Sequence, residues 1–206
     1  MDILTLALLL TVGLYWLNNR HQRRRMLLLG RHLQPYQIEK LMEALMDGYL
    51  RALGESTPER REQIWHLLAT TEHQLSEQFR RFAKDFAQVQ ADSTRISRLP
   101  LPLPLADVWW PQATFDMRQA LSIHARGLER AVHRQPGQSE RDRAFTMSAE
   151  LLLMQHTCHW FCKSHTMASA RMLARHQTPY AQLVASVAPE TRRDYLALVR
   201  GQAAAQ

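Results

Sequence analysis

Residues 155–165 read Gln-His-Thr-Cys-His-Trp-Phe-Cys-Lys-Ser-His, the stretch of the sequence richest in side chains that could do chemistry. At about 100° per residue of an α-helix, Cys158, Cys162 and His165 fall within about 60° of one another on one face. Thiolate and imidazole groups are ligands for zinc, copper(I) and haem iron. His124 lies on the apolar face of the preceding predicted helix and could complete a four-ligand set. The pattern therefore raises a metal- or haem-binding helical bundle as one hypothesis.

The alternative interpretation of these residues is an ordinary helix interior. Cysteine is often buried as a small hydrophobe, and a lone buried histidine usually hydrogen-bonds to a neighbour. The spacing C-x3-C-x2-H is not that of a zinc finger, and the C-x-x-C-H motif of c-type haem attachment does not occur. Redox sensing by the two thiols is also disfavoured, since apolar burial keeps a thiol protonated. We therefore expect core packing and no cofactor.

Motifs of the common enzyme classes are absent from the sequence. It has no Walker A loop, no dinucleotide-binding glycine pattern, no H-E-x-x-H motif and no G-x-S-x-G motif. The E-x-x-H pairs of di-iron bundles do not occur either. No zinc-finger or RNP-like motif supports nucleic-acid binding. We expect a non-enzymatic protein with no nucleic-acid partner.

Residues 3–17 (ILTLALLLTVGLYWL) form an uncharged apolar run. Fifteen helical residues span about 22 Å, which is less than the ~30 Å hydrocarbon core, but flanking asparagines and snorkelling arginines extend the span. Tyr15 and Trp16 lie where aromatic rings anchor at the headgroups. In a cleaved signal peptide the positive charge would precede the run, whereas here it follows. We predict a transmembrane anchor over residues 1–19, with a buried core helix as the alternative.

Positive charge is concentrated directly behind this run. The formal net charge of the 206 residues is +7, and all but three of the 26 basic residues are arginine. The five arginines of this segment, Arg20, Arg23, Arg24, Arg25 and Arg31, are predicted to bind anionic lipid from a basic juxtamembrane helix over residues 20–34, lying along the membrane surface. Positive charge stays inside, so the N-terminus is expected outside and the body in the cytoplasm of a bacterial-type cell. Two cysteines, expected as free thiols, fit that reducing compartment.

Helical periodicity dominates the rest of the chain, which predicts an all-α protein: one N-terminal transmembrane helix and a cytoplasmic bundle of about five helices. We expect a first helical pair over residues 35–93 and a second helical half over residues 112–201. That second half contains a long central helix that continues to about His176. Residues 202–206 are expected to be a frayed tail.

A proline-rich segment over residues 94–111 separates the two halves. Pro100, Pro102 and Pro104 alternate with leucines, a pattern that excludes a helix and a central strand. Because leucines disfavour full solvation, we expect an extended strap packed along the bundle, with Val108, Trp109 and Trp110 at least partly buried at its end. The alternative is a proline-rich ligand for an aromatic groove, although the P-x-x-P spacing is absent.

Taken together, these features favour a non-enzymatic accessory or scaffold subunit of a bacterial inner-membrane assembly. The expected partners are membrane lipid and other proteins of that assembly, and self-association is possible. The alternative is the membrane-tethered metal- or haem-binding bundle built on Cys158, Cys162 and His165. A membrane-tethered regulator of nucleic acid is the weakest candidate class.

Overall fold

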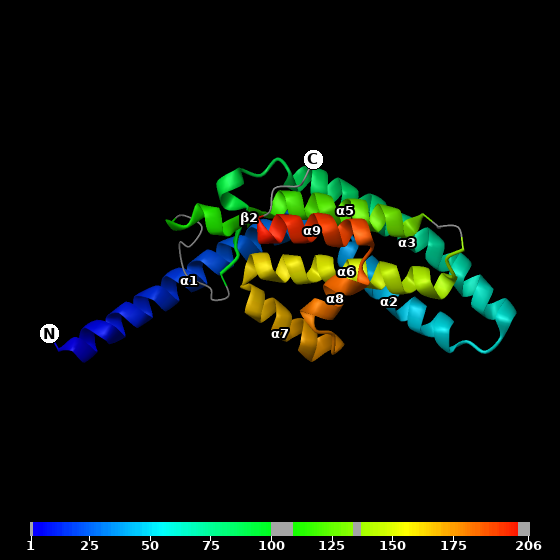
Figure 1. Cartoon of the computed structure of the whole chain (residues 1–206), viewed down its shortest axis with the longest axis horizontal. Coiled ribbons are helices and arrows are strands. Elements are labelled where there is room, and N and C mark those ends of the chain that lie inside the picture. The colour runs from blue at the N-terminus through cyan, green and yellow to red at the C-terminus, as the bar shows by residue number, and fades with distance from the viewer. Residues whose placement is uncertain (1, 100–108, 134–136, 202–206) are drawn as a thin grey trace.

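The computed structural model describes residues 2–99, 109–133 and 137–201 (Figure 1). This part of the chain contains eight α-helices and one short antiparallel ribbon. The helices are α1 (Ile3–Leu33), α2 (Ile38–Gly54), α3 (Pro58–Phe86), α5 (Met117–Val132), α6 (Glu140–Cys162), α7 (His165–His176), α8 (Tyr180–Ser186) and α9 (Pro189–Arg200), and the strands are β1 (Arg95–Ser97) and β2 (Thr114–Asp116). The predicted predominance of helix is confirmed. Seven described helices follow α1, more than the five or so expected.

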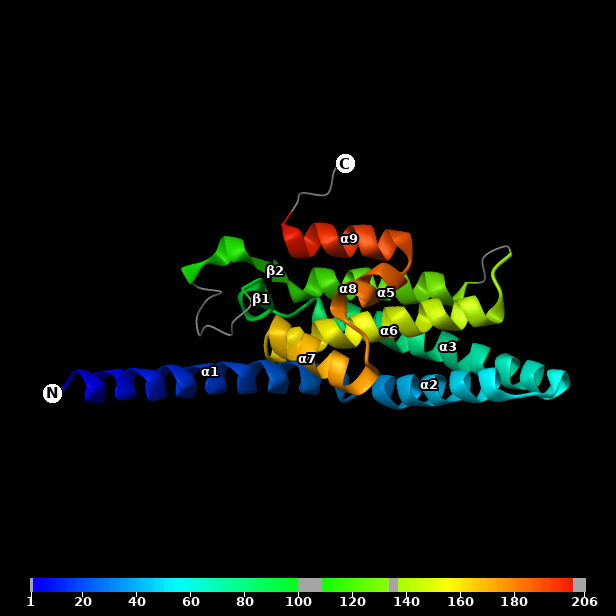
Figure 2. The same ribbon diagram turned by 60° about the horizontal axis from the view of Figure 1, so that its bottom comes forward.

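An α2–α3 hairpin forms the part of the body farthest from the N-terminus (Figure 1). Pro58 occupies the first turn of α3, where its missing N–H is tolerated. Helix α3 buries an apolar seam, in which Leu75, Phe79, Phe82 and Phe86 are all fully enclosed. Along one edge of the molecule α2 follows α1, so these two helices extend one after the other (Figure 2).

Helix α6 is the central helix of the body. It is buried on most of its circumference, from Ala144 to Phe161, as the nearly continuous apolar sequence predicts. It contacts α5 on one side and α7 and α8 on another, while α9 packs against α5 (Figure 2). The main core lies among α1, α2, α3, α5 and α6, and a second apolar cluster lies among α5, α6, α7, α8 and α9.

The predicted continuation of the central helix to His176 is wrong. Helix α6 ends at Cys162, and Lys163 has the non-helical dihedrals φ −128° and ψ −93°. The Ser164 hydroxyl then accepts a hydrogen bond from the backbone N–H of Met167 and caps a separate helix, α7. A serine at this position offers the backbone a new helix start, and the chain turns back against α6.

The ribbon is the second departure from prediction. Ile96 pairs with Phe115, and the backbone N–H of Arg98 donates to the carbonyl of Ala113 at 2.8 Å. The helix expected from about residue 112 therefore begins at Met117, where Asp116 accepts from the N–H of Arg118. Pairing of the two strands brings Ser97 and Thr114 side by side, so the described residues on either side of the proline-rich segment lie at the same edge of the body.

Some predictions made from the sequence concern residues that the structure does not describe. Pro100, Pro102, Pro104 and Val108 lie outside the described residues, as does the predicted tail over 202–206. Trp109 and Trp110, for which at least partial burial was expected, are 65% and 48% exposed. Their indoles pack on each other, at 5.9 Å between ring centroids, on the outside of the body.

Candidate membrane-facing site

The two halves of α1 have different surroundings. Every residue from 3 to 17 is exposed, and this half projects free of the body (Figures 1 and 2). Among the described residues, α1 is the one helix long and apolar enough to cross a membrane, and its most apolar 18-residue window is 0% buried. Within the described part of the chain, the body therefore does not cover this segment.

The second half of α1 docks on the body. Leu29 is buried in the main core, Leu28 and Leu33 pack against it, and the His32 ring meets Phe86 edge-on with centroids 5.4 Å apart. Because α1 is one continuous helix, the basic segment extends the axis of the apolar run. The basic segment expected over residues 20–34 is the second part of this helix, which ends at Leu33.

Three of the five arginines form a solvent-facing group next to the apolar run. Arg20, Arg23 and Arg24 are exposed and line a shallow groove with Trp16 and Leu27. The guanidinium carbon of Arg20 lies 5.4 Å from the centre of the Trp16 ring, within the range of a cation–π contact. An aromatic ring followed by cations is the pattern that suits the headgroup region of a bilayer.

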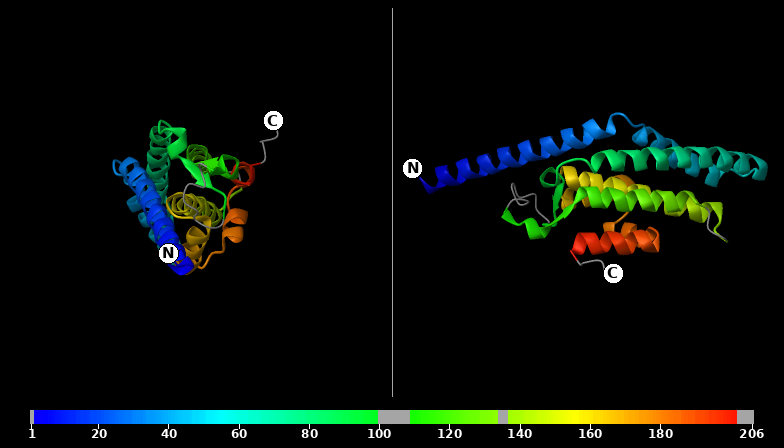
Figure 3. Two further views of the ribbon diagram at one scale, coloured as in Figure 1. Left: turned by 90° about the vertical axis from the view of Figure 1, so that its left-hand side faces the viewer. Right: turned by 90° about the horizontal axis from the view of Figure 1, so that it is seen from above.

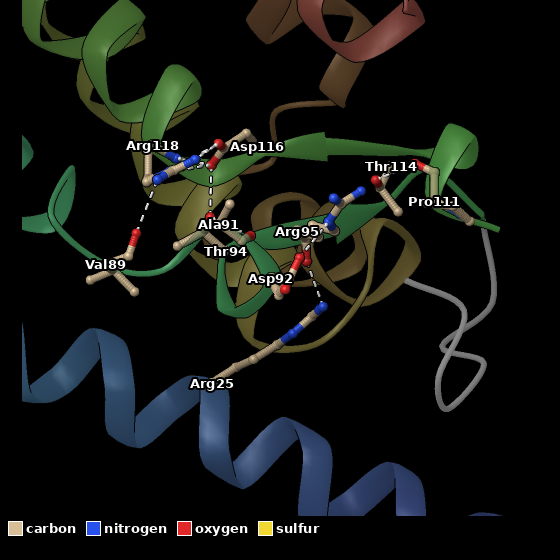
Figure 4. Close-up of polar contacts among 10 residues, drawn as sticks. All are labelled: Arg25, Val89, Ala91, Asp92, Thr94, Arg95, Pro111, Thr114, Asp116 and Arg118. Atoms are coloured by element: carbon tan, nitrogen blue, oxygen red, sulfur yellow. Dashed lines mark hydrogen bonds and ion pairs between the residues drawn. The ribbon is translucent and has the colours of Figure 1, made fainter. Parts of the chain in front are cut away.

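Arg25 has a different role from the other arginines. Its guanidinium donates to the backbone carbonyl of Phe161 at 3.3 Å and to that of Arg95 at 2.5 Å, and it lies 5.3 Å from the centre of the Phe161 ring. The Phe161 carbonyl is in the last turn of α6, where carbonyls lack helical partners and attract positive charge. Arg25 therefore connects α1 to α6 and β1 (Figure 4). Arg31 is exposed but lies roughly 16 Å along the axis from Arg20, deeper on the body side.

The base of the ribbon is held by a polar cluster (Figure 4). The Thr94 hydroxyl donates to Asp116 Oδ1 at 2.8 Å, and the Arg118 guanidinium donates to Asp116 Oδ2 at 2.7 Å and to the carbonyl of Val89 at 3.0 Å. Burial alone would raise the pKa of Asp116, but the hydrogen bonds from Arg118 and Thr94 lower it overall. The charged cluster thus ties the end of α3, the ribbon and the start of α5 together.

The two cysteines face the main core. Cys158 and Cys162 both pack against its apolar residues, and the Cys158 thiol lies 4.0 Å from the Met154 sulfur. Burial raises the pKa of both thiols, that of Cys162 to about 11. At neutral pH they are protonated, which makes them poor nucleophiles.

The predicted histidine ligands lie in other surroundings. His165 is beyond the break after Cys162, and its ring packs against Trp160 and Tyr180 with centroids 4.5 and 4.7 Å away. His124 Nε2 lies 2.9 Å from the Thr157 hydroxyl. Within the described ranges, no group of three or more His, Cys, Asp or Glu side chains is placed to hold a metal ion. The single helical face on which the metal hypothesis relied does not exist, because α6 and α7 are separate helices.

Buried acidic side chains were not anticipated from the sequence. Glu72 is fully buried between α2, α3 and α6, where it accepts from the Tyr49 hydroxyl at 2.6 Å and pairs with Arg143. Arg143 also contacts Glu140 at 2.8 Å. Burial raises the pKa of Glu72 against the opposing effect of its two partners. A carboxylate at a seam position of α3 is the one sequence signal that could have revealed this pair.

Glu150 is a second buried carboxylate, on α6. Its Oε1 accepts from the backbone N–H of Ala188 at 3.1 Å, and burial raises its pKa to about 7. The close approach of α5 at this point favours glycine, since a Cβ on Gly127 would lie 2.4 Å from Glu150 Oε2 and 2.8 Å from Thr191 Oγ1, so that these side chains would have to move. These contacts fasten the short α8–α9 connection to the two central helices.

The chain matches no protein-family model, no curated protein and no solved structure.

Proposed function

We propose that this protein is a non-enzymatic accessory or scaffold subunit of a bacterial inner-membrane assembly. In this proposal, residues 3–17 cross the membrane and the helical body stands in the cytoplasm. The observation that carries the proposal is the division of α1 into an exposed apolar half and a docked half. An apolar helix of this length that no part of the body covers is costly in water and stable in lipid.

The distribution of charge supports the orientation. No acidic residue occurs between residues 3 and 38, and Arg20, Arg23 and Arg24 are exposed where the apolar half ends. Short segments rich in arginine remain on the cytoplasmic side during insertion. The body begins on that same side, so the N-terminus faces outward.

The opposite end of the body supports a role in binding proteins. A groove there is lined by Leu53, Trp65, Arg61, Glu62 and Arg141, with Pro58 and Glu140 also at its rim. It combines apolar surface with charges of both signs, which is the composition of a protein–protein interface rather than of a lipid-binding surface. Exposed Leu50 and Phe145 add apolar surface on α2 and α6.

Membrane fractionation of the full chain and of a variant lacking residues 1–18 tests the anchor. We expect the full chain to stay in membranes washed with high salt and alkaline carbonate, and the shortened chain to be soluble with a cooperative thermal transition. Intact mass measurement distinguishes an anchor from a cleaved signal, because cleavage would shorten the mature chain. A full chain found in the soluble fraction, or a shortened mature chain, would overturn the proposal.

A reporter fused after Gln206 tests the orientation. A cytoplasmic signal is expected from the full chain. As a matched control, substituting Arg20, Arg23 and Arg24 with Gln should reduce that signal, since the same residues specify the inside. A periplasmic signal from the unmodified sequence would contradict the proposed orientation.

A further inference from the structure

The ribbon ends in a pair of exposed indoles at the end of the body from which the free half of α1 projects. Residues 109–113 project from the body on the side where the N-terminal half of α1 extends, and this placement is the same in Figures 1, 2 and 3. Trp109 and Trp110 are 65% and 48% exposed and pack edge to face. Two large exposed aromatic side chains at one tip mark a surface that meets something other than water.

Helix and strand geometry place this tip near the level of Trp16. The hydrogen bond between Arg25 and the Arg95 carbonyl holds the base of the ribbon against α1. From Arg25 back to Trp16 the helix rises about 13 Å, and four extended residues from Arg95 to Leu99 reach about 13 Å. Figure 4 shows the ribbon running in that direction, with Pro111 on the side toward which α1 continues to its N-terminus.

The tip is presented on a firmly packed base. Ile96 and Phe115 are buried on the two strands, and the Phe115 ring meets Trp160 with centroids 5.0 Å apart. The Trp160 indole N–H donates to the carbonyl of Ser97 at 3.0 Å. Arg98 reaches from the ribbon to the carbonyls of Gln112 and Leu198 at 2.8 and 3.1 Å. Because the base is fixed on several sides, the exposed indoles have a defined position relative to α1.

We propose that Trp109 and Trp110 form a second membrane contact, with their indoles inserted among the headgroups of the leaflet from which α1 emerges. This inference rests on the proposed membrane anchor. Tryptophan is suited to that depth because its ring is apolar and its N–H can still reach polar groups. The contact would lie at about the level of Trp16, Arg20 and Arg23 on α1, at the same end of the body, which favours lipid over a protein partner.

Quenching by brominated lipid tests the contact in the full chain. The probe is a vesicle of phosphatidylcholine and phosphatidylglycerol with bromine near the headgroup end of the acyl chains. A variant with Trp16→Phe and Trp65→Phe keeps Trp109, Trp110 and the buried Trp160 as emitters. The emission of Trp109 and Trp110 is the difference between this variant and one that also carries Trp109→Phe and Trp110→Phe. We expect brominated lipid to quench most of that difference.

The matched control carries Trp16→Phe, Trp109→Phe and Trp110→Phe, so that Trp65 at the far groove and Trp160 in the core remain. Its emission should be insensitive to brominated lipid. If the Trp65 substitution disturbs folding, the unmodified chain compared with Trp109→Phe/Trp110→Phe gives the same difference. Flotation with the vesicles, measured on each sample, reports the anchor separately.

The possible outcomes separate the two proposals. Flotation without quenching of Trp109 and Trp110 would leave the anchor standing and overturn the second contact. If emission from these residues shifts with protein concentration instead of with bromine, a second copy of the chain covers the tip, and the lipid assignment is wrong. If the full chain does not float with the vesicles, both the proposed anchor and the second membrane contact are wrong.

Discussion

Along α1 from residue 3 onward, charge has a single sign, whereas around the groove at the far end cations alternate with carboxylates. Residues 3–38 contain no Asp or Glu. Around the far groove, Arg61 stands beside Glu62 and Arg141 beside Glu140. A surface of one sign attracts an extended surface of the other sign, such as anionic lipid. Mixed charges cancel at long range and specify individual partners at contact, as protein interfaces do.

The same contrast extends into the body. Arg143, two residues after Arg141, is buried and pairs with Glu72 and Glu140. A buried, paired arginine such as Arg143 holds neighbouring helices together, whereas Arg23 and Arg24 on α1 are exposed to the medium around the protein. The comparison between the two ends is therefore open to direct test by substituting arginines that differ in burial.

The largest effect is expected from Arg143→Met. Removing one partner of a buried ion pair leaves the other charge uncompensated, which costs about 3–5 kcal/mol of unfolding free energy. Urea unfolding of the detergent-solubilised full chain measures this cost. The control Arg141→Met, on the same helix but exposed, should change the stability by about 0.5 kcal/mol or less. Equal costs for the two substitutions would show that the Glu72 pair is not structural.

Lowering the pH affects the two regions differently. The arginines of α1 keep their charge, whereas buried titratable groups in the body change their protonation. Burial lowers the pKa of His124 and His156 to about 3, so their contribution to stability is present above pH 6.5 and is lost as pH falls below it. Glu150 acts in the opposite sense. Its pKa, raised to about 7 by burial, adds stability as pH falls from 7 toward 4.5.

We therefore predict that Glu150→Gln loses more stability than the unmodified chain when pH falls from 7.5 to 5. The additional loss should be about 2 kcal/mol, since each unit of pKa shift corresponds to about 1.4 kcal/mol. Urea unfolding at the two pH values measures it, with the exposed Glu129→Gln as control. A parallel pH dependence of Glu150→Gln and the unmodified chain would show that the carboxyl of Glu150 is not retained in its protonated form.

A smaller effect is expected from Arg25→Met, which removes the connection between α1, α6 and β1. We expect a loss of about 1–2 kcal/mol, since hydrogen bonds to charged groups contribute roughly 1.5–3 kcal/mol and this side chain is partly solvated. Arg24→Met, one residue earlier and exposed, is the matched control and should be close to neutral. Amide hydrogen exchange in Leu28–Leu33 would rise in the first variant alone. If both variants behave alike, Arg25 belongs with the exposed arginines.

Periodic features of the sequence predicted their structural counterparts well. The seam of α3 and the apolar circumference of α6 each repeat a simple pattern over several turns, so local irregularities matter little. His66 and His73 lie on α3 away from its apolar seam, and both are exposed. Apolar residues that recur every three or four positions mark the buried face of a helix, and this pattern can be read from a single sequence.

Features that depend on one residue, or on contacts between residues distant in the sequence, could not be predicted in the same way. The break between α6 and α7 depends on one capping serine, Ser164, inside a pattern that otherwise continues as helix. The ribbon depends on two three-residue strands whose partners are 17 to 21 residues apart in sequence, too far for local propensity to pair them. Glu72 is buried because Tyr49 and Arg143 reach it from other helices. The exposure of Trp109 and Trp110 likewise follows from where the ribbon ends.

The arrangement of α1 and α2 one after the other also sets a distance. The docked part of α1 and the whole of α2, at 1.5 Å per residue, together extend roughly 40–50 Å from the level of Leu17. If residues 3–17 span the bilayer, the far groove stands at that height above the lipid. Because α1 has no proline between Ile3 and Leu33, any tilt of the membrane-spanning half is passed on to the body. The helix then acts as a rigid connection, and bilayer thickness, which sets the tilt of the spanning half, also sets the angle of the groove to the membrane.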